Sequence, residues 1–426
     1  MKEQEDTLMK KLTILLAVLL CCTGCAAPIA DPSVADPSVA DLMKNITPNP
    51  VFAKELADVS DAAVTDFALR LFRTGMEDGK NTLLSPLSVL AALSMTANGT
   101  KGETLSQMEA VLGMPVEELN TWLHIYTANL PEEETYKLHL ANSIWFTDSP
   151  TFTVNEDFLQ TTADYYDAGI YRAPFDQSTC DAINSWVSDN TDGMIPQILE
   201  QIPEDAVMYL VNALAFDAQW QKPYAEYQIR EGSFTAEDGT EQTTQMMYSE
   251  ENRYLEDGKT VGFIKYYTDR KYAFAALLPE EGVTVSEYVA ALTGERLQQI
   301  LADAEHTAVE TALPQFETSY DVEMSDILQT MGMTDAFDGW KADLTGLGTS
   351  TEGNINISRV LHKTYISVDG KGTKAAAATA VEAVTESAME MPEPKRVYLD
   401  RPFVYMLIDC ETNLPFFIGT LMTIPE

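Results

Sequence analysis

The stretch GTKAAAATAVEAVTESAMEMPEP, residues 372–394, alternates between two kinds of side chain. Every second residue is small or β-branched and carries no charge: Thr373, Ala375, Ala377, Thr379, Val381, Ala383 and Thr385. Between residues 373 and 386, the charges fall only on the positions in between, at Lys374, Glu382 and Glu386. A period of two is typical of a strand, and a small, neutral face would fit between two existing strands.

A helix or a linker explains the same stretch in other ways. Alanine is the strongest helix former, so residues 375–378 also fit a short surface helix. Taken alone, the stretch favours a helix or a linker over a strand. No proline lies between Thr373 and Met391, however, so a strand there would lack no backbone donor.

The composition is that of a large, strongly acidic protein. The 426 residues are 45% hydrophobic, which is enough for a substantial core. Asp and Glu number 66 against 27 Lys and Arg, giving a formal net charge of -39. Such a surface repels nucleic acids and anionic membranes, so neither is an expected partner.

Residues 9–25, MKKLTILLAVLLCCTGC, have a basic start, a short apolar run and small residues before a cysteine. The apolar run is about a dozen residues, too short to span a membrane, and it indicates a secretory signal over residues 1–25. The acidic MKEQED before it is unlike a signal, which leaves Met1 and Met9 open as the start. CTGC resembles a bacterial lipobox, which implies lipidation of Cys25; a plain secretory signal is the alternative.

Residues 26–52 contain a repeated ADPSV unit with little to bury, and we expect a disordered tether there. No second linker follows, so residues 53–426 are expected to form one domain.

Helical spacing over residues 59–76 predicts a helix, and alternation over residues 135–147 predicts a strand. VMYLVNALAFDAQW, residues 207–220, fits a buried central strand, and residues 401–424 fit a hairpin through Asn413. Early helices and late strands predict an α+β protein.

The sequence offers no catalytic or metal-binding motif. The four histidines, His124, His139, His306 and His362, do not lie at metal-ligand spacing, and neither HExxH nor GxSxG occurs. DGKGTK lacks the residue order of a phosphate-binding loop. Beyond the N-terminal signal only Cys180 and Cys410 remain, too few for a disulfide framework. The sequence therefore predicts neither an enzyme nor a cofactor.

From about Asp61 to the C-terminus the chain resembles the serpin family, through segments that occur in the family's order. They include NTLLSPLSVLAALSMTANGTKGET from residue 81, INSWVSDNTDGMIPQIL from residue 183, LVNALAFDAQWQKPY from residue 210, VLHKTYISVDGKGTKAAAATA from residue 360 and RPFVYMLIDCETNLPFFIGTL from residue 401. The resemblance implies an α+β domain with three β-sheets, eight or nine helices and an exposed reactive-centre loop over about residues 370–394. It also implies that a protease cleaves this loop and is trapped as an acyl-enzyme when the loop inserts into the main sheet.

The resemblance also assigns the residues of the loop. Its hinge comprises Gly370, Gly372, Thr373, Lys374, Ala375, Ala376, Ala377 and Ala378. Many inhibitory serpins have Glu where this chain has Gly370 and Lys374; Gly370 is expected to add backbone freedom, and Lys374 to face outward. The cleaved bond is expected among Thr385, Glu386, Ser387, Ala388 and Met389.

Two positions remain open for that bond. Counting from Gly372 places it between Glu386 and Ser387, which suits a glutamate-directed protease. Counting back from the C-terminal signature places it between Ala388 and Met389, which suits an elastase-like or chymotrypsin-like protease. We favour an elastase-like target. Trypsin-like targets are disfavoured, because no basic residue lies between residues 385 and 391.

Other residues match structural positions of the family. The polar cluster beneath the point where the main sheet opens corresponds to Asn81, Ser85, Ser88, Asn212 and His362, and Trp220 matches the position where the loop first enters the sheet. We expect a monomer that captures a serine protease covalently, with cysteine proteases as a further target class. It would be held at the bacterial cell envelope by a lipid on Cys25, or otherwise be extracellular. The alternative is a non-inhibitory serpin that acts as a binding module.

Overall fold

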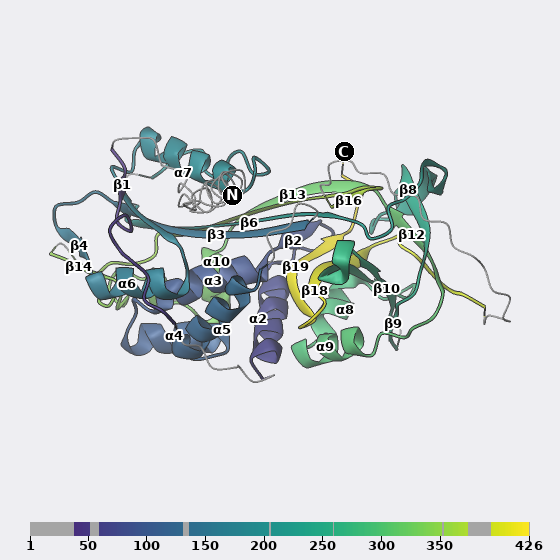
Figure 1. The fold of residues 1–426 in the computed structure, drawn as a ribbon, viewed down its shortest axis with the longest axis horizontal. Helices are drawn as coiled ribbons and strands as arrows, with labels where there is room; N and C mark the ends of the chain where they lie inside the picture. Colours follow the sequence, from purple (N-terminus) through teal and green to yellow (C-terminus); the bar gives the residue numbers. More distant parts are fainter. Residues whose placement is uncertain are drawn as a thin grey trace, which may run out of the picture. The chain divides into compact units, whose positions relative to one another are not determined.

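The computed structural model describes residues 38–51, 59–130, 136–203, 206–258, 260–351, 353–373 and 393–425. Over these ranges the chain forms nine α-helices and four β-sheets (Figure 1). The α+β class predicted from the sequence is confirmed. A small sheet of β4 (Phe152–Val154) and β14 (Gly348–Ser350) accompanies the three larger sheets.

The largest sheet, called the main sheet here, has seven strands. Their order is β1 (Ala40–Asp41), β5 (Gly169–Ala173), β3 (Tyr136–Thr147), β6 (Met208–Gln219), β16 (Gly372–Thr373), β15 (Arg359–Val368) and β13 (Phe316–Glu323). Helix α7 (Gln177–Asn190) lies over one face of this sheet, and helix α3 (Pro86–Ala97) lies under the other (Figure 1). The central strand predicted over residues 207–220 is β6.

Two further sheets pack beside the main sheet. The six-stranded sheet has the order β2 (Thr82–Leu84), β19 (Leu414–Leu421), β18 (Phe403–Asp409), β11 (Tyr272–Pro279), β10 (Thr260–Tyr266) and β9 (Tyr254–Asp257). The four-stranded sheet has the order β17 (Lys395–Tyr398), β12 (Val309–Pro314), β8 (Glu241–Glu251) and β7 (Ile229–Thr235). The predicted C-terminal hairpin is formed by β18 and β19, and Asn413 in its turn has a left-handed φ of 55°.

Helix α3 is surrounded by protein on all sides. The Ser85 side chain caps it, Pro86 occupies its first turn, and every one of its residues is buried. A helix in such a place needs apolar side chains all round instead of on one face. The other helices are α2 (Val59–Gly75), α4 (Gly102–Leu112), α5 (Val116–Ala128), α6 (Glu156–Tyr165), α8 (Val285–Ala291), α9 (Gly294–Ala302) and α10 (Ser325–Met331).

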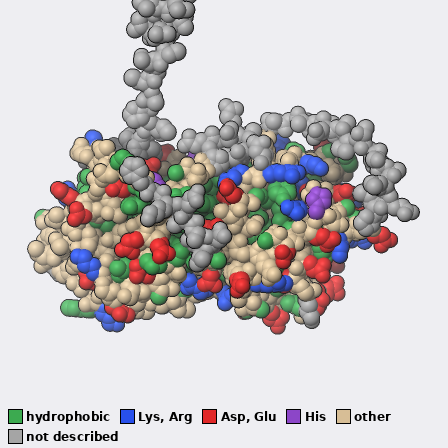
Figure 2. Space-filling model, turned by 60° about the horizontal axis from the view of Figure 1, so that its bottom comes forward, with side chains coloured by type: hydrophobic (Ala, Val, Ile, Leu, Met, Phe, Trp, Pro, Cys, Tyr) green, Lys and Arg blue, Asp and Glu red, His purple; other side chains and the backbone are tan. Residues whose placement is uncertain are grey.

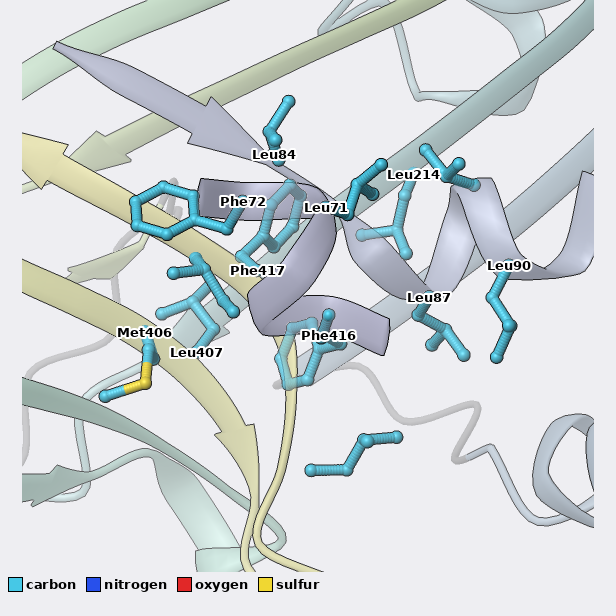
Figure 3. Close-up of a cluster of buried hydrophobic side chains, with 14 of the residues drawn as sticks. Leu71, Phe72, Leu84, Leu87, Leu90, Leu214, Met406, Leu407, Phe416 and Phe417 are labelled. Atoms are coloured by element: carbon cyan, nitrogen blue, oxygen red, sulfur yellow. The ribbon is translucent and has the colours of Figure 1, made fainter. Parts of the chain in front are cut away.

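The core lies where helices α2 and α3 meet the main sheet and the C-terminal hairpin (Figure 3). Its residues come from segments far apart in the sequence and are almost fully buried: Leu71, Phe72, Leu84, Leu87, Leu90, Leu214, Met406, Leu407, Phe416 and Phe417. Burying side chains of this size supplies the main favourable term in folding. The core therefore joins the N-terminal helices to the last strands of the chain.

The expectation of an unpacked tether over residues 26–52 is wrong for its C-terminal part. Strand β1 pairs antiparallel with β5, and the N–H of Leu42 donates to the carbonyl of Ile170 at 2.9 Å. Leu42, Met43 and Ile46 pack against the core. The physical reason is that these three apolar side chains follow the ADPSV repeats and have surface to bury. Residues 26–37 lie outside the described part of the chain.

Candidate functional site where the loop enters the main sheet

Strand β15 turns back into β16 through residues 369–372, called the hinge turn here. The backbone N–H of Asp369 donates to the carbonyl of Gly372 at 3.0 Å. The Asp369 carboxylate accepts the N–H of Lys371 at 2.7 Å and that of Gly372 at 3.1 Å. Asp369 therefore closes the turn through both its backbone and its side chain.

Strand β16 occupies the gap between β6 and β15. Gly372 pairs with Gln219 and Thr373 with Ala218. A Cβ on Gly372 would lie 2.1 Å from the carbonyl oxygen of Ala218, so only glycine allows this close approach of two backbones. Thr373 is 1% exposed, on the buried face to which the alternation in the sequence assigns it.

Within the loop, the structure describes residues only as far as Thr373, and again from Glu393. The other predicted hinge and scissile residues lie outside the described part: Lys374, Ala375, Ala376, Ala377, Ala378, Thr385, Glu386, Ser387, Ala388 and Met389. Cys25 also lies outside it.

Beyond β16, strands β6 and β15 pair directly with each other. Five residue pairs form this parallel ladder, from Arg359 with Tyr209 to Lys363 with Ala213. Strands β6 and β15 are therefore separated by β16 at one end, and they pair directly with each other over residues 209–213 and 359–363. A longer β16 in this sheet has only one path, between β6 and β15, and it has to part this ladder.

Four of the five residues predicted for the polar cluster form one hydrogen-bonded group. The Asn212 Oδ1 accepts the Ser88 hydroxyl at 2.9 Å and lies 2.6 Å from the His362 Nδ1. The backbone N–H of Ser85 donates to the His362 Nε2 at 3.1 Å. Since Nε2 accepts, the ring proton sits on Nδ1 and is donated to Asn212. Burial lowers the pKa of His362 to about 3, so the ring is neutral.

Asn81 lies apart from this group. Its side chain accepts the backbone N–H of Thr423 at 3.1 Å and donates to the carbonyl of Thr423 at 2.8 Å. These hydrogen bonds therefore connect the residue before β2 to the segment that follows β19. Asn142, which sequence reasoning missed, pairs with Asn212 across β3 and β6, and its buried Oδ1 has no hydrogen-bond partner among the described residues. The signal for it was a polar residue within the alternating strand TYKLHLANSIWFT.

The hinge turn is held from outside by two residues. The Trp220 backbone N–H donates to the carbonyl of Lys371 at 2.8 Å, and its indole Nε1 donates to the carbonyl of Asp369 at 2.8 Å. The Tyr224 backbone N–H donates to the carbonyl of Gly370 at 2.8 Å. Three successive carbonyls of the chain thus have donors from the segment that follows β6. The structure places Trp220 where the loop meets the sheet.

Gly370 differs from its sequence-based interpretation. Its backbone does not adopt a left-handed φ, and it is buried in the hinge turn. A Cβ at this position would lie 2.6 Å from the Ile229 Cδ1. That atom is the end of a flexible side chain, so a Cβ would only require Ile229 to move, and the freedom of φ expected for Gly370 is not used.

Tyr267 and Lys265 belong to the same site, although the sequence analysis did not single them out. The Tyr267 ring stacks on Trp220 at 4.4 Å between centroids, with 9° between the planes. Its hydroxyl lies 2.5 Å from the Thr373 Oγ1. Lys265 lies behind Trp220, with its Nζ 5.4 Å from the ring centroid. The only sequence signal was a lysine between apolar residues in GFIKYY.

A family model described as "Serpin (serine protease inhibitor)" matches residues 62–424. The chain is a serpin. Serpins are generally protease inhibitors and not catalytic enzymes. Human Serpin B9 is 30% identical over 378 residues, which cover 85% of this chain and 98% of that protein.

A solved structure of the same family agrees with the fold. The thermophilic serpin tengpin in its native state is 45% identical and has a TM-score of 0.87, with 91% of this chain and 100% of that chain covered. Tengpin in its latent state has a TM-score of 0.77 at 42% identity, with coverage of 88% and 100%. This serpin therefore lies closer to the native-state structure than to the latent-state one.

The described residues were also compared with the requirements of a metal site and of a membrane span. Among the described residues, no group of three or more His, Cys, Asp or Glu could hold a metal ion, and no helix is long and apolar enough to cross a membrane. Cys180 and Cys410 are free thiols. On the face in Figure 2, acidic side chains are scattered over the described surface, with basic ones between them.

Proposed function

We propose that this serpin inhibits a serine protease as a suicide substrate. The observation that carries the proposal is the position of β16, which is seated between β6 and β15 and points toward the ladder that a longer strand would part. Small, uncharged side chains at every second position from Thr373 to Thr385 suit such a slot.

In the proposed reaction, the serine hydroxyl of the protease attacks the carbonyl carbon of the cleaved bond in the loop. The C–N bond breaks, its nitrogen takes up a proton and leaves as a new amino terminus, and an ester joins the loop to the protease. The freed strand then extends β16 from Thr373. A strand of about 14 residues at ~3.3 Å each spans roughly 46 Å, and the protease is carried about that far.

Insertion changes the hydrogen bonding of the main sheet. It separates the five residue pairs between β6 and β15, and it draws His362 away from Asn212. One ladder is lost and two are gained, one on each side of the new strand, so the backbone gains hydrogen bonds. This gain, together with burial of the small face of the loop, favours the inserted state, and trapping requires insertion to finish before water hydrolyses the ester.

The target we propose is an elastase-like serine protease, with a chymotrypsin-like one as the next choice. Cleavage between Ala388 and Met389 presents a small residue to the pocket that selects the side chain before the bond. Cleavage between Glu386 and Ser387 would instead indicate a glutamate-directed protease. Lipidation of Cys25 would place the inhibitor at a cell envelope, where it would meet extracellular proteases.

The proposed function is tested by mixing the purified serpin with elastase-type, chymotrypsin-type and trypsin-type proteases. We expect a complex that survives boiling in detergent, and mass spectrometry of the released C-terminal peptide then locates the cleaved bond. Cleavage without any complex, for every protease, would overturn the proposal in favour of a non-inhibitory serpin.

Substitution of Thr373 tests whether insertion is required. Thr373 is 1% exposed, so Thr373→Arg would bury a long cation, and we expect cleavage to continue while the yield of complex falls at least about tenfold. The matched control is Thr373→Ser, which keeps the hydroxyl beside Tyr267 and should trap normally. Normal trapping by Thr373→Arg, measured by gel densitometry, would contradict loop insertion as the mechanism.

A further inference from the structure

A buried ion pair lies directly behind the residues that hold the hinge turn. Lys265, near the end of β10, is 1% exposed, and its Nζ lies 2.7 Å from the Glu251 Oε1. The same Nζ donates to the carbonyl of Lys222 at 3.2 Å. A buried ammonium is costly unless it is paired and hydrogen-bonded, so this one is built into the site.

The ammonium of Lys265 also faces two aromatic rings. Its Nζ lies 4.3 Å from the ring centroid of Tyr224 and 5.4 Å from that of Trp220. Attraction between a cation and a ring is strongest where water is excluded. Burial works against the charge, but Tyr224 and Glu251 outweigh it and raise the pKa of Lys265 above its ordinary value, so the group is a cation at neutral pH.

These two rings belong to the residues whose N–H groups hold the hinge turn. Tyr224 and Trp220 together donate to the carbonyls of residues 369–371. The Trp220 ring also stacks on that of Tyr267, whose hydroxyl contacts Thr373. Lys265 contacts the rings of Tyr224 and Trp220, the two residues that donate to the carbonyls of the hinge turn. It therefore acts on the turn through one intervening residue. It also joins three sheets, because Glu251 ends β8, Lys265 lies in β10 and Trp220 follows β6.

We propose that Lys265 is a positioning residue for loop insertion. Held by Glu251, it fixes the rings of Tyr224 and Trp220, and through them the turn from which β16 grows. The turn and the two residues of β16 are already in place before cleavage, so they act as the starting point to which each further residue of the loop adds. The inference rests on the proposed function, because only a chain that inserts its loop needs this starting point.

The test removes the cation without leaving a lone buried charge. Lys265→Met alone would strand the Glu251 carboxylate, so the test variant is Lys265→Met combined with Glu251→Gln. The matched control is Lys271→Met with Asp409→Asn, which neutralises another ion pair with a buried carboxylate on the same sheet, at 3.0 Å, away from the carbonyls of the hinge turn. The control also removes the ion pair between Lys271 and the exposed Glu411, at 3.1 Å, so it disturbs at least as many ion pairs as the test variant and controls for a general loss of stability.

The first readout needs no protease. Hydrogen exchange at the backbone amides of Trp220 and Tyr224 should speed up about tenfold or more in the Lys265 double and stay near the wild-type rate in the control. Unchanged protection in the Lys265 double, or an equal loss in both doubles, would overturn the proposal.

The second readout is the number of serpin molecules consumed per protease trapped. The loop sequence is intact, so the rate of the first cleavage should be unchanged, while consumption per trapped protease should rise about fivefold or more in the Lys265 double only. Equal consumption by the wild type and both doubles would overturn the inference although the proposed function stands. If the wild type traps no protease, the proposed function fails, and the exchange measurement still decides whether Lys265 positions the turn.

Discussion

At the scale of single residues, the buried ring of His362 makes the stability of the fold depend on pH. Burial lowers its pKa from 6.5 to about 3, so the folded chain keeps the ring neutral while the unfolded chain binds a proton near pH 6.5. Between these values the unfolded state binds more protons. Folding therefore loses stability as pH falls below 6.5, and above that value the residue has no effect.

The loss can be measured and assigned to His362. One pH unit corresponds to about 1.4 kcal/mol, so the free energy of unfolding should fall by about 2 kcal/mol between pH 7 and pH 5 through this residue. In His362→Gln, whose amide can make both hydrogen bonds of the ring, this part of the dependence should vanish. Urea titrations at the two pH values test it, with exposed His306 as the control in His306→Gln. An unchanged pH dependence in His362→Gln would show that the neutral ring is not its source.

For single residues, the sequence alone could not show which groups would form hydrogen bonds with one another. Ser85, Ser88, Asn212 and His362 were placed together from their resemblance to family positions, and the structure brings them within hydrogen-bond distance. Asn81 could not be separated from them by residue type, because an amide bonds equally well to a side chain or to a terminal backbone segment. Its backbone partners after β19 exist only once the C-terminus has docked beside β2.

At the scale of elements, the packed segment around β1 covers the edge of the main sheet at β5. It adds backbone pairing and apolar burial to a strand that would otherwise present free N–H and C=O groups. The segment should therefore contribute to stability even though it precedes the residues that the family model matches.

Replacing Leu42 and Ile46 together by alanine measures this contribution. Both side chains are half-buried, so we expect the pair to lower the free energy of unfolding by about 2 kcal/mol, below the cost of fully buried sites. Thermal and urea unfolding are the measurements. Exposed Lys44→Ala in the same segment is the control, and an effect of the double no larger than that of Lys44→Ala would show that the segment is not held by its apolar side chains.

Long elements with a clear period were predicted well from the sequence, and close approaches between elements were not. Strand β6 and the hairpin of β18 and β19 follow from apolar runs and a turn residue. The contact of Gly372 with Ala218 and the stack of Tyr267 on Trp220 depend on which strands meet, which no local period encodes. Lys265 was missed for a related reason, since its partners Glu251 and Tyr224 come from other parts of the chain.

At the scale of the whole molecule, we expect charge to influence how fast this serpin would meet a target protease. A net charge of -39 creates a negative potential that attracts cationic proteins and repels anionic ones. Salt screens this potential, because the Debye length shortens from about 10 Å at 0.1 M to about 3 Å at 1 M. Selection among proteases that share a pocket preference is therefore expected to depend on their surface charge.

The association rate is the quantity that reveals this effect. Between about 0.05 M and 0.5 M NaCl, capture of a cationic elastase-like protease should slow about tenfold or more. Capture of an acidic protease with the same pocket preference should be unchanged or faster, which makes it the control. Progress curves of protease activity give both rates, and the same salt response for the two enzymes would exclude long-range attraction.

Seating Thr373 between β6 and β15 before any cleavage has a consequence for the length of the loop. If the loop inserts as proposed, the pleat of the strand, counted from Thr373, would turn odd-numbered residues inward and even-numbered ones outward. One residue added or removed between Thr373 and Glu382 would then exchange the two sets beyond it and turn Glu382 and Glu386 inward. Adding or removing two residues would preserve the count, so we expect this segment to tolerate changes of length in steps of two.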